Sequence, residues 1–278
     1  MRKCEEVADG VLVMTSRRYA TTTTAVLGAR EALVVDPAWD ADELAGVAEV
    51  LSDAQAHCVA GVATHLHYDH VLWHPGLGDA PRWATPWTVS RWRVQRDDLL
   101  APLVGDLPEE LLDLAGRLRP FPPATRHELH ILAAGRGPAT ELPSPYSVPW
   151  GGREVIVHEH DAHARGHLAL ELPDVAVVIV GDMLSDIELP YPDPDEPDLV
   201  TYLVGLDRLS EVVRRARVLI PGHGAPTTAP MARLDADRRY LDAVLAGRDP
   251  RDSRIDNPDM AAVHERTLEQ ARSTPPLS

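Results

Sequence analysis

Short apolar runs in the first third of the chain predict strands joined by turns. These runs cover residues 11–14, 22–27, 32–35 and 59–63. The segment Gly28-Ala29-Arg30 predicts a hairpin turn between the second and third runs, and the last run is typical of a buried strand. Residues 41–51 instead repeat apolar side chains at helical spacing. They predict an amphipathic helix with Asp40 as its N-cap.

The remainder of the chain predicts a mixture of strands and helices. Strands are expected at about 82–84, 152–157, 168–172, 175–180 and 218–220. Helices are expected at 88–100, 107–118, 199–215, 229–246 and 260–272, with a helical turn at 71–74. Segments 134–151 and 189–197 are rich in loop-forming residues. We therefore predict a single domain over residues 1–278, with a helical and loop insertion at about 85–150 and C-terminal helices from about 229.

The amino-acid composition argues against two classes of binding partner. The formal net charge is −16 at pH 7, which argues against nucleic acid and anionic membranes, because both are bound mainly through Lys and Arg. Cys4 and Cys58 do not form a disulfide framework, and we expect two reduced thiols. No apolar leader or bilayer-length apolar run is present. We expect a cytoplasmic, bacterial protein that acts on a small molecule; the oligomeric state carries no sequence signal.

The densest candidate chemistry is the stretch Thr64-His65-Leu66-His67-Tyr68-Asp69-His70, directly after a predicted buried strand. Imidazole and carboxylate are common ligands of zinc and similar metals. His65 and His67 are two residues apart, so a turn can aim both rings at one point. Asp69 and His70 can reach a second point nearby. This spacing predicts two metal ions rather than one.

Three later segments place similar residues at the ends of predicted strands. These are the polar cluster at 158–167, Asp182, and Pro221-Gly222-His223-Gly224. Ligands collected from several strand ends are a common way for a rigid scaffold to build a site. Asp36 also ends a strand, where it either caps a loop or supports a site residue.

Together these motifs resemble those of the metallo-β-lactamase superfamily. The stretch 65–70 matches its H-x-H-x-D-H motif, and His163-Ala164-Arg165-Gly166-His167 is similar to its H-T-P-G-H element. Gly181-Asp182, Pro221 to Gly224 and Asp36-Pro37 match three further elements, all in the family's order. The resemblance implies an α/β fold, an αβ/βα four-layer sandwich of two mixed sheets. The metal site would lie at one edge.

Transferred by position, the resemblance also assigns ligands. His65, His67 and His163 would hold one metal, Asp69, His70 and His223 the other, and Asp182 would bridge both. Asp36 and His167 would support these ligands. The expected cofactor is Zn²⁺, two per chain, with Fe or Mn as substitutes. The expected nucleophile is a hydroxide shared by the metals, with catalytic parts for Asp69 and Asp182.

Departures from the family pattern bear on the substrate. The main zinc β-lactamases have Cys where Asp182 stands, so the chain is more similar to the glyoxalase II and lactonase branch. Quorum-signal lactonases usually have Tyr where Ser185 stands, which weakens that assignment. We expect a dinuclear zinc hydrolase of a small ester, lactone, thioester or amide. The alternatives are a mononuclear iron oxygenase of the persulfide-dioxygenase kind and a non-catalytic ligand-binding member.

Several neighbouring residues have no assigned role. His158 and His160 have no family counterpart and are expected to be ordinary strand-exit residues. His74 and Tyr68 either pack the ligand loop or touch substrate, and Arg165 either binds an anionic substrate group or pairs with a surface Asp. The apolar residues of the insertion either wall a pocket or pack the insertion onto the domain; they are Trp87, Trp92, Leu99, Leu100 and Phe121.

Overall fold

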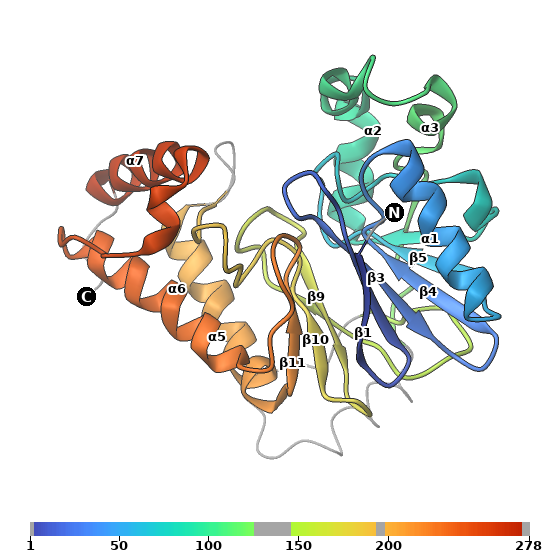
Figure 1. The fold of residues 1–278 in the computed structure, drawn as a ribbon. Helices are drawn as coiled ribbons and strands as arrows, with labels where there is room; N and C mark the ends of the chain where they lie inside the picture. Colours follow the sequence, from blue (N-terminus) through green and yellow to red (C-terminus); the bar gives the residue numbers. More distant parts are fainter. Residues whose placement is uncertain (1–2, 125–145, 193–197, 274–278) are drawn as a thin grey trace.

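Two mixed β-sheets face each other in the middle of the molecule, and helices cover their outer faces (Figure 1). The computed structural model describes residues 3–124, 146–192 and 198–273. Its layers are those of the α/β sandwich that the family resemblance implies. Among the described residues, no helix is long and apolar enough to cross a membrane.

The larger sheet has seven strands in sequence order, antiparallel from β1 to β4 and parallel from β4 to β7. They are β1 (Lys3–Ala8), β2 (Val11–Thr15), β3 (Thr22–Leu27), β4 (Glu31–Val35), β5 (His57–Val62), β6 (Arg82–Ala84) and β7 (Leu118–Pro120). The smaller sheet has the order β11-β10-β9-β8, in which only β10 and β11 are parallel. Its strands are β8 (Ile156–Glu159), β9 (Leu168–Leu172), β10 (Val177–Ile179) and β11 (Val218–Ile220).

Helix α1 lies on the outer face of the larger sheet, and α5 and α6 lie outside the smaller one (Figure 1). The helices are α1 (Ala41–Asp53), α2 (Pro86–Leu100), α3 (Glu109–Leu114), α5 (Leu199–Arg215), α6 (Pro230–Leu245) and α7 (Pro258–Ser273). In the described part of the chain, short 3-10 helices cover Pro75–Leu77, Ala101–Leu103 and Ser253–Asp256.

Side-chain alternation along the central strands explains why both faces of each sheet are buried. On β4, Leu33 and Val35 belong to the cluster between the sheets, whereas Val34 packs toward α1 with Val47. On β9, Leu168, Leu170 and Leu172 all face the other sheet. Strands with two apolar faces can exist only between two covering layers, so this pattern fixes the sandwich.

The structure corrects several predicted elements. Strands β1 and β7 were not predicted; both are edge strands. The predicted helix at 107–118 is only Glu109–Leu114, and the expected helical turn at 71–74 is instead a 3-10 helix at Pro75–Leu77. Asp40 occupies the N-cap position but makes no side-chain capping bond; its carboxylate pairs with Arg17 and Arg18.

The predicted insertion is partly described. Most of the loop predicted at 134–151, and 193–197 within the second predicted loop, lie outside the described residues. Trp92 and Leu100 are buried in a cluster with α3, whereas Phe121 belongs to the core between the sheets. These side chains therefore pack the segment onto the rest of the domain, which was one of the two roles considered for them. The single-domain organisation stays a prediction.

Candidate metal centre

Strand direction brings the first group of candidate residues together. Because β4 and β5 are parallel, with Val35 opposite Val62, their carboxyl ends meet at one edge of the sheet. Asp36 follows β4 and Thr64 follows β5. Asp36 Oδ1 accepts the Thr64 backbone N–H at 2.8 Å, and Asp36 Oδ2 accepts the Thr64 hydroxyl at 2.6 Å. The ligand loop of residues 65–70 is thereby fixed at its start.

The second sheet supplies the remaining residues in the same way. Strands β10 and β11 are parallel, with Ile179 opposite Ile220, so Asp182 and His223 follow neighbouring strand ends. Strand β9 is antiparallel to β10, so the segment that precedes β9, with His163, arrives at the same edge. The convergence of these strand ends was predicted from the motifs, and the strand directions explain it.

Backbone hydrogen bonds join the two sheets beside the candidate residues. The Leu168 N–H donates to Thr64 O at 3.0 Å, and the Thr22 N–H donates to Gly222 O at 2.7 Å. These bonds hold the ligand-bearing loops of one sheet against those of the other, so the relative position of the candidate residues is set by the backbone.

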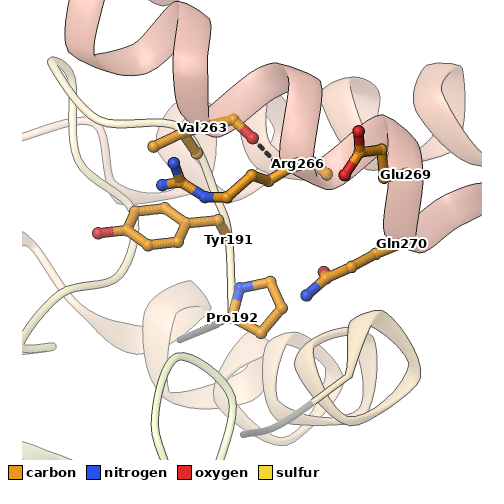
Figure 2. Close-up of a pocket in the computed structure, with 7 residues that line it drawn as sticks. Tyr191, Pro192, Val263, Arg266, Glu269 and Gln270 are labelled. Carbon is orange, nitrogen blue, oxygen red and sulfur yellow. Dashed lines mark hydrogen bonds between the residues drawn. The ribbon is translucent and has the colours of Figure 1, made fainter. Parts of the chain in front are cut away.

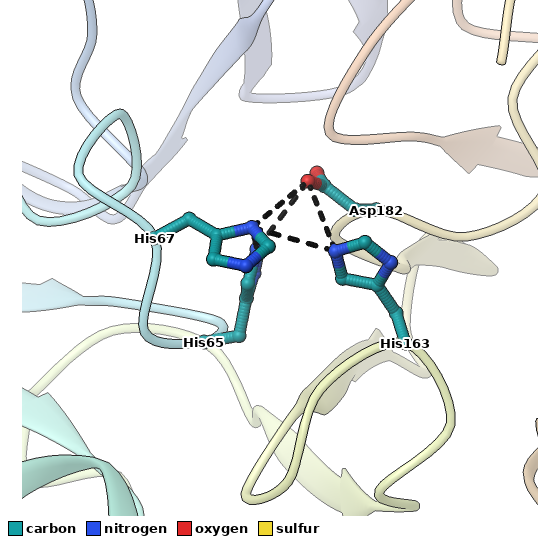
Figure 3. A group of neighbouring side chains, drawn as sticks. All are labelled: His65, His67, His163 and Asp182. Atoms are coloured by element: carbon teal, nitrogen blue, oxygen red, sulfur yellow. Dashed lines mark hydrogen bonds and ion pairs between the residues drawn. The ribbon is translucent and has the colours of Figure 1, made fainter. Parts of the chain in front are cut away.

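Three histidines surround one oxygen of Asp182 (Figure 3). Asp182 Oδ2 lies 3.3 Å from His65 Nε2, 3.9 Å from His67 Nδ1 and 3.7 Å from His163 Nε2. His65 Nε2 and His67 Nδ1 are 2.9 Å apart. The ligand atoms of these four residues all lie within 4.8 Å of one another, a group that could hold a metal ion.

A second group lies on the other side of the same carboxylate. Asp69, His70 and His223 also bring their ligand atoms within 4.8 Å of one another. His70 Nε2 lies 3.2 Å from Asp182 Oδ1 and 3.5 Å from Asp69 Oδ2. His223 Nε2 lies 3.3 Å from Asp69 Oδ2 and 3.4 Å from Asp182 Oδ2. Asp182 therefore faces both groups.

Hydrogen bonds at the far ring nitrogen orient the histidines. His163 Nδ1 lies 3.0 Å from Tyr191 O, and His223 Nδ1 lies 3.0 Å from Tyr19 O. A backbone carbonyl can only accept, so each Nδ1 carries a proton and Nε2 faces the cluster.

Asp36 orients two more rings. His70 Nδ1 lies 2.9 Å from Asp36 Oδ2, and His65 Nδ1 lies 3.0 Å from the Thr64 hydroxyl, which itself donates to Asp36. Asp36 is 2% exposed. Such carboxylate-to-imidazole contacts are typical supports of metal-ligating histidine.

The donor atoms fit a small divalent cation. Ligands about 2.0–2.1 Å from a tetrahedral zinc ion lie about 3.3 Å from one another, which is near the separations given above. His70 Nε2 and Asp182 Oδ1 are both buried, and apart from their contacts inside the cluster they have no hydrogen-bond partner among the described residues. Buried polar atoms are rarely left in this state, and a cation would satisfy both.

Burial and charge shift the pKa values of these groups in opposite directions. Burial lowers the pKa of His65 and of His167 well below the ordinary value. Burial also acts against the charged forms of His70 and His223, but the carboxylates, above all Asp182, outweigh it and raise the pKa of both well above that value. Metal binding would displace protons from this second pair.

His160 is not the ordinary strand-exit residue that the sequence suggested. It is 1% exposed, and its Nε2 lies 2.9 Å from His167 Nδ1. His167 Nε2 in turn accepts the Asp182 backbone N–H at 3.2 Å. A Cβ on Gly181 would lie only 2.6 Å from His167 Nε2, so this imidazole pair packs directly behind Asp182.

The other unassigned residues lie outside the cluster. His158 Nε2 pairs with Glu171 at 2.8 Å, and His74 Nδ1 accepts the Gly76 N–H at 3.0 Å and so caps a 3-10 helix. The Arg165 guanidinium lies 5.7 Å from the centre of the Trp87 ring, a contact that neither earlier interpretation anticipated. Tyr68 packs edge-on against Trp39, with ring centroids 5.3 Å apart.

Glu188 belongs beside the cluster, although the sequence analysis did not single it out. Its ligand atom lies within 4.8 Å of those of Asp182 and His223. Burial, with further contributions from Asp182 and Asp69, raises the pKa of Glu188 to about 7. An acidic residue six positions after Asp182 is a weak signal, because only the turn between them decides where its side chain points.

Tyr191 links the cluster to a cavity of about 180 Å³ beside α7 (Figure 2). Its ring lies edge-on to His163, with centroids 5.1 Å apart. Across the cavity from Tyr191 and Pro192, α7 presents Arg266, Glu269 and Gln270. The sequence predicted the helix but not its proximity to a candidate ligand histidine.

Several solved structures share the fold of this chain, but their sequence identity to it is low. A metallo-β-lactamase from Erythrobacter litoralis is 19% identical, with a TM-score of 0.51 over 84% of this chain and 94% of its own. One from Hirschia baltica is 16% identical, with a TM-score of 0.55 over 84% and 94%. A stereoselective inverting sec-alkylsulfatase from Pseudomonas sp. is 15% identical, with a TM-score of 0.59 over 89% of this chain and 42% of its own.

The comparison with a sequence model of a whole family gives stronger evidence for the family of this chain. No curated protein matches the chain in sequence. The model of the metallo-beta-lactamase superfamily, however, matches residues 17–247, a span that includes every candidate ligand named above. The chain therefore belongs to the metallo-beta-lactamase superfamily.

Proposed function

We propose that this protein is a dinuclear metal-dependent hydrolase, with zinc as the expected metal, that acts on a small ester, lactone, thioester or amide. His65, His67 and His163 hold the first cation, Asp69, His70 and His223 hold the second, and Asp182 bridges them. The observation that carries this proposal is the orientation of the histidines. Each Nδ1 of His65, His70, His163 and His223 lies within 3.0 Å of an oxygen, and the Nε2 atoms converge on the Asp182 carboxylate.

Two divalent cations in such a site would lower the pKa of a water molecule and polarise the acyl oxygen of a substrate. The chain's own part is to keep the ligands in place. Asp36 and the carbonyl oxygens of Tyr19 and Tyr191 hold the ring protons away from the cluster, so all four Nε2 atoms remain available. The carboxylates of Asp69 and Asp182 bring only two negative charges. The loaded site would therefore remain positive and favour an anionic transition state.

Two further features support the acyl-hydrolase assignment. Asp rather than Cys stands at the bridging position, as in the glyoxalase II and lactonase branch. The Ser185 hydroxyl donates to His223 O at 2.7 Å and accepts the Ile187 and Glu188 N–H groups. Ser185 thus stabilises the turn after Asp182. Its hydroxyl is already hydrogen-bonded, so it cannot take the place of the Tyr of the quorum-signal lactonases. This difference favours an ester or thioester substrate other than a quorum-signal lactone.

Elemental analysis of the purified protein, coupled to a substrate screen, tests the proposal. We expect about two zinc ions per chain and turnover of at least one ester, lactone, thioester or amide. Lactam, phosphodiester and alkyl sulfate substrates complete the panel. The double variant His65→Ala, His67→Ala should lose the first metal and all activity yet stay folded. His57→Ala, on an exposed residue, is the matched control.

Other outcomes of the same experiment would overturn the proposal. One iron per chain would indicate the oxygenase alternative instead. Undiminished turnover by the metal-free double variant would contradict the ligand assignment. A metal-loaded protein that is inert on the whole panel would favour a binding protein.

A further inference from the structure

A tight turn carries Arg165 between two imidazoles of the candidate centre. The His167 N–H donates to Ala164 O at 3.1 Å, which closes a β-turn. Gly166, the third residue of the turn, has a φ of +73°, a conformation typical of glycine in type II turns. Arg165 is therefore the second residue of the turn, and its Cα lies at most about 7 Å from that of His163.

The backbone of this turn is fixed against the start of α2. Gly166 O accepts the Thr85 hydroxyl at 3.0 Å, and the Gly166 N–H donates to Asp161 Oδ1 at 2.6 Å. A Cβ on Gly166 would lie 2.6 Å from Thr85 Oγ1 and 3.1 Å from Trp87 Cε3, so the turn is closely packed there. The backbone of Arg165 is thus held in place before any substrate binds.

The guanidinium of Arg165 lies beside an aromatic ring and has no acidic partner. It is 5.7 Å from the centre of the Trp87 ring, a cation–π contact. Asp161 is the nearest acidic residue in the sequence, but its carboxylate accepts the Gly166 N–H. Arg165 is exposed and forms no ion pair with any part of the chain that the structure describes. In a protein with a net charge of −16, this guanidinium remains available to an anion from solution.

Solvent reaches the candidate centre beside the same turn. His67 is the most exposed of the candidate ligands, with 25% of its side chain accessible, whereas each of the others is 9% exposed or less. Its ring lies 5.0 Å from that of His163, which is two residues before Arg165. Trp87 packs against the apolar cluster that includes Leu66 of the ligand loop. The pair of Arg165 and Trp87 therefore borders the side from which a substrate must enter.

The chemistry of the guanidinium selects the kind of anion. Its planar fork of N–H donors matches the two oxygens of a carboxylate, and the Trp87 ring restricts the orientation of the fork. The metal group would receive the scissile carbonyl group. A carboxylate bound by Arg165 would therefore belong to a more distant part of the same substrate.

We infer that Arg165, held beside Trp87, binds a carboxylate at the far end of the substrate, so that the enzyme prefers anionic esters or thioesters to neutral ones. This inference rests on the proposed hydrolase function. It adds a specificity-determining residue and names the class of substrate.

Matched pairs of substrates test the inference. The nitrophenyl monoester of adipic acid is compared with that of the half-amide of adipic acid, which places the carboxylate on the acyl side. The acetyl thioester of mercaptohexanoic acid is compared with that of mercaptohexanamide, which places it on the leaving group. In at least one pair we expect a kcat/KM about tenfold higher for the carboxylate, mainly through a lower KM, because it adds a charge-assisted hydrogen bond. Arg165→Gln should reduce this preference to less than about twofold.

Two further variants and the salt concentration serve as controls. Arg165→Lys keeps the charge but not the planar fork, so it should retain an intermediate preference. Arg91→Gln removes the same charge from an exposed position of α2 and should keep the wild-type preference. Added salt should weaken the preference of the wild type, because Arg165 is exposed. Thermal melts and metal analysis check that every variant is folded and loaded.

The different failures can be told apart. If the wild type hydrolyses both members of each pair equally well, or hydrolyses neither pair but turns over other esters or lactones, the inference is wrong while the hydrolase stands. If Arg165→Gln keeps the wild-type preference, the carboxylate binds elsewhere and the inference is wrong. A loss of preference in Arg91→Gln as well would indicate a general effect of charge and would also overturn it. If no acyl substrate is hydrolysed at all, the proposed function fails, and the inference fails with it.

Discussion

The Asp36 carboxylate accepts a hydrogen bond from His70, with 2.9 Å between Oδ2 and Nδ1. The same carboxylate also accepts the Thr64 N–H and hydroxyl. One buried side chain at the end of β4 thus fixes the start of the ligand loop at Thr64. It also fixes the ring orientation of His70, six residues after Thr64. Asp36 connects the fold of the larger sheet to the chemistry at its edge.

Replacement of Asp36 by Asn should weaken metal binding while the protein stays folded. An amide offers one acceptor oxygen where three donors converge, so at least one of the contacts to Thr64 or His70 is lost. Loss of such support typically lowers metal affinity 10- to 100-fold. Competition with a chromogenic chelator measures this, and Asp53→Asn at the exposed end of α1 is the control. Equal affinities in the two variants would show that Asp36 does not orient His70.

Gly222→Ala should disrupt the centre by steric contact alone. A Cβ at this position would lie 2.0 Å from Asp182 Oδ1, so the Asp182 carboxylate must move. We expect the purified variant to contain less than half of the wild-type metal. The matched control is Gly46→Ala on α1, where a Cβ meets nothing within 4 Å. That change should stabilise the protein by about 0.5–1 kcal/mol through helix propensity. A full metal content in Gly222→Ala would contradict the placement of Asp182.

His160 should make the metal-free protein sensitive to acid. Burial lowers the pKa of His160 from 6.5 to about 3, so between these pH values the unfolded chain binds a proton that the folded chain does not. The contribution of His160 to stability is therefore fully present above pH 6.5 and is lost as the pH drops, by up to about 1.4 kcal/mol per pH unit. In His160→Gln this slope should become shallower, as measured by urea unfolding between pH 4 and pH 7. His57→Gln, on an exposed histidine, should keep the wild-type slope; a steep slope in both variants would assign the effect elsewhere.

Arg254→Met should destabilise the protein more than an ordinary surface change. Arg254 Nη1 lies 2.7 Å from Asp237 Oδ1, and the two side chains are 6% and 1% exposed. Removal of one partner leaves a buried, uncompensated carboxylate, which costs about 3–5 kcal/mol.

A double-mutant cycle separates this cost from lost packing. Arg254→Met combined with Asp237→Leu should recover most of the loss, as measured by urea unfolding. Independent, additive effects of the two changes would contradict the pairing. Because Arg254 also holds the carbonyl oxygens of Ser185 and Glu188, the single variant should bind the second metal more weakly too.

The sequence by itself determined the candidate ligands and most of the secondary structure. A compact stretch such as His65 to His70 is visible without a fold, because its ligand side chains are neighbours in the chain. The central strands were also predictable, since β4 and β9 are buried on both faces and consist of short apolar runs. The edge strands β1 and β7 were missed, because half of Lys3–Ala8 is charged and Leu118–Pro120 is three residues long. Both exist through pairing with a neighbour, which the local pattern does not encode.

The tertiary structure alone decided the contacts that lie outside the motifs. Glu188 reaches the second group because the turn after Asp182 is braced by Ser185 and Arg254, and Arg254 lies 66 positions further along the chain. His160 became a support of His167 only because both rings are buried behind Asp182. The carbonyl oxygens of Tyr19 and Tyr191 orient His223 and His163, and a backbone carbonyl has no residue type to recognise. Contacts between distant segments depend on how strands and turns are packed, so they appear only once the chain is folded.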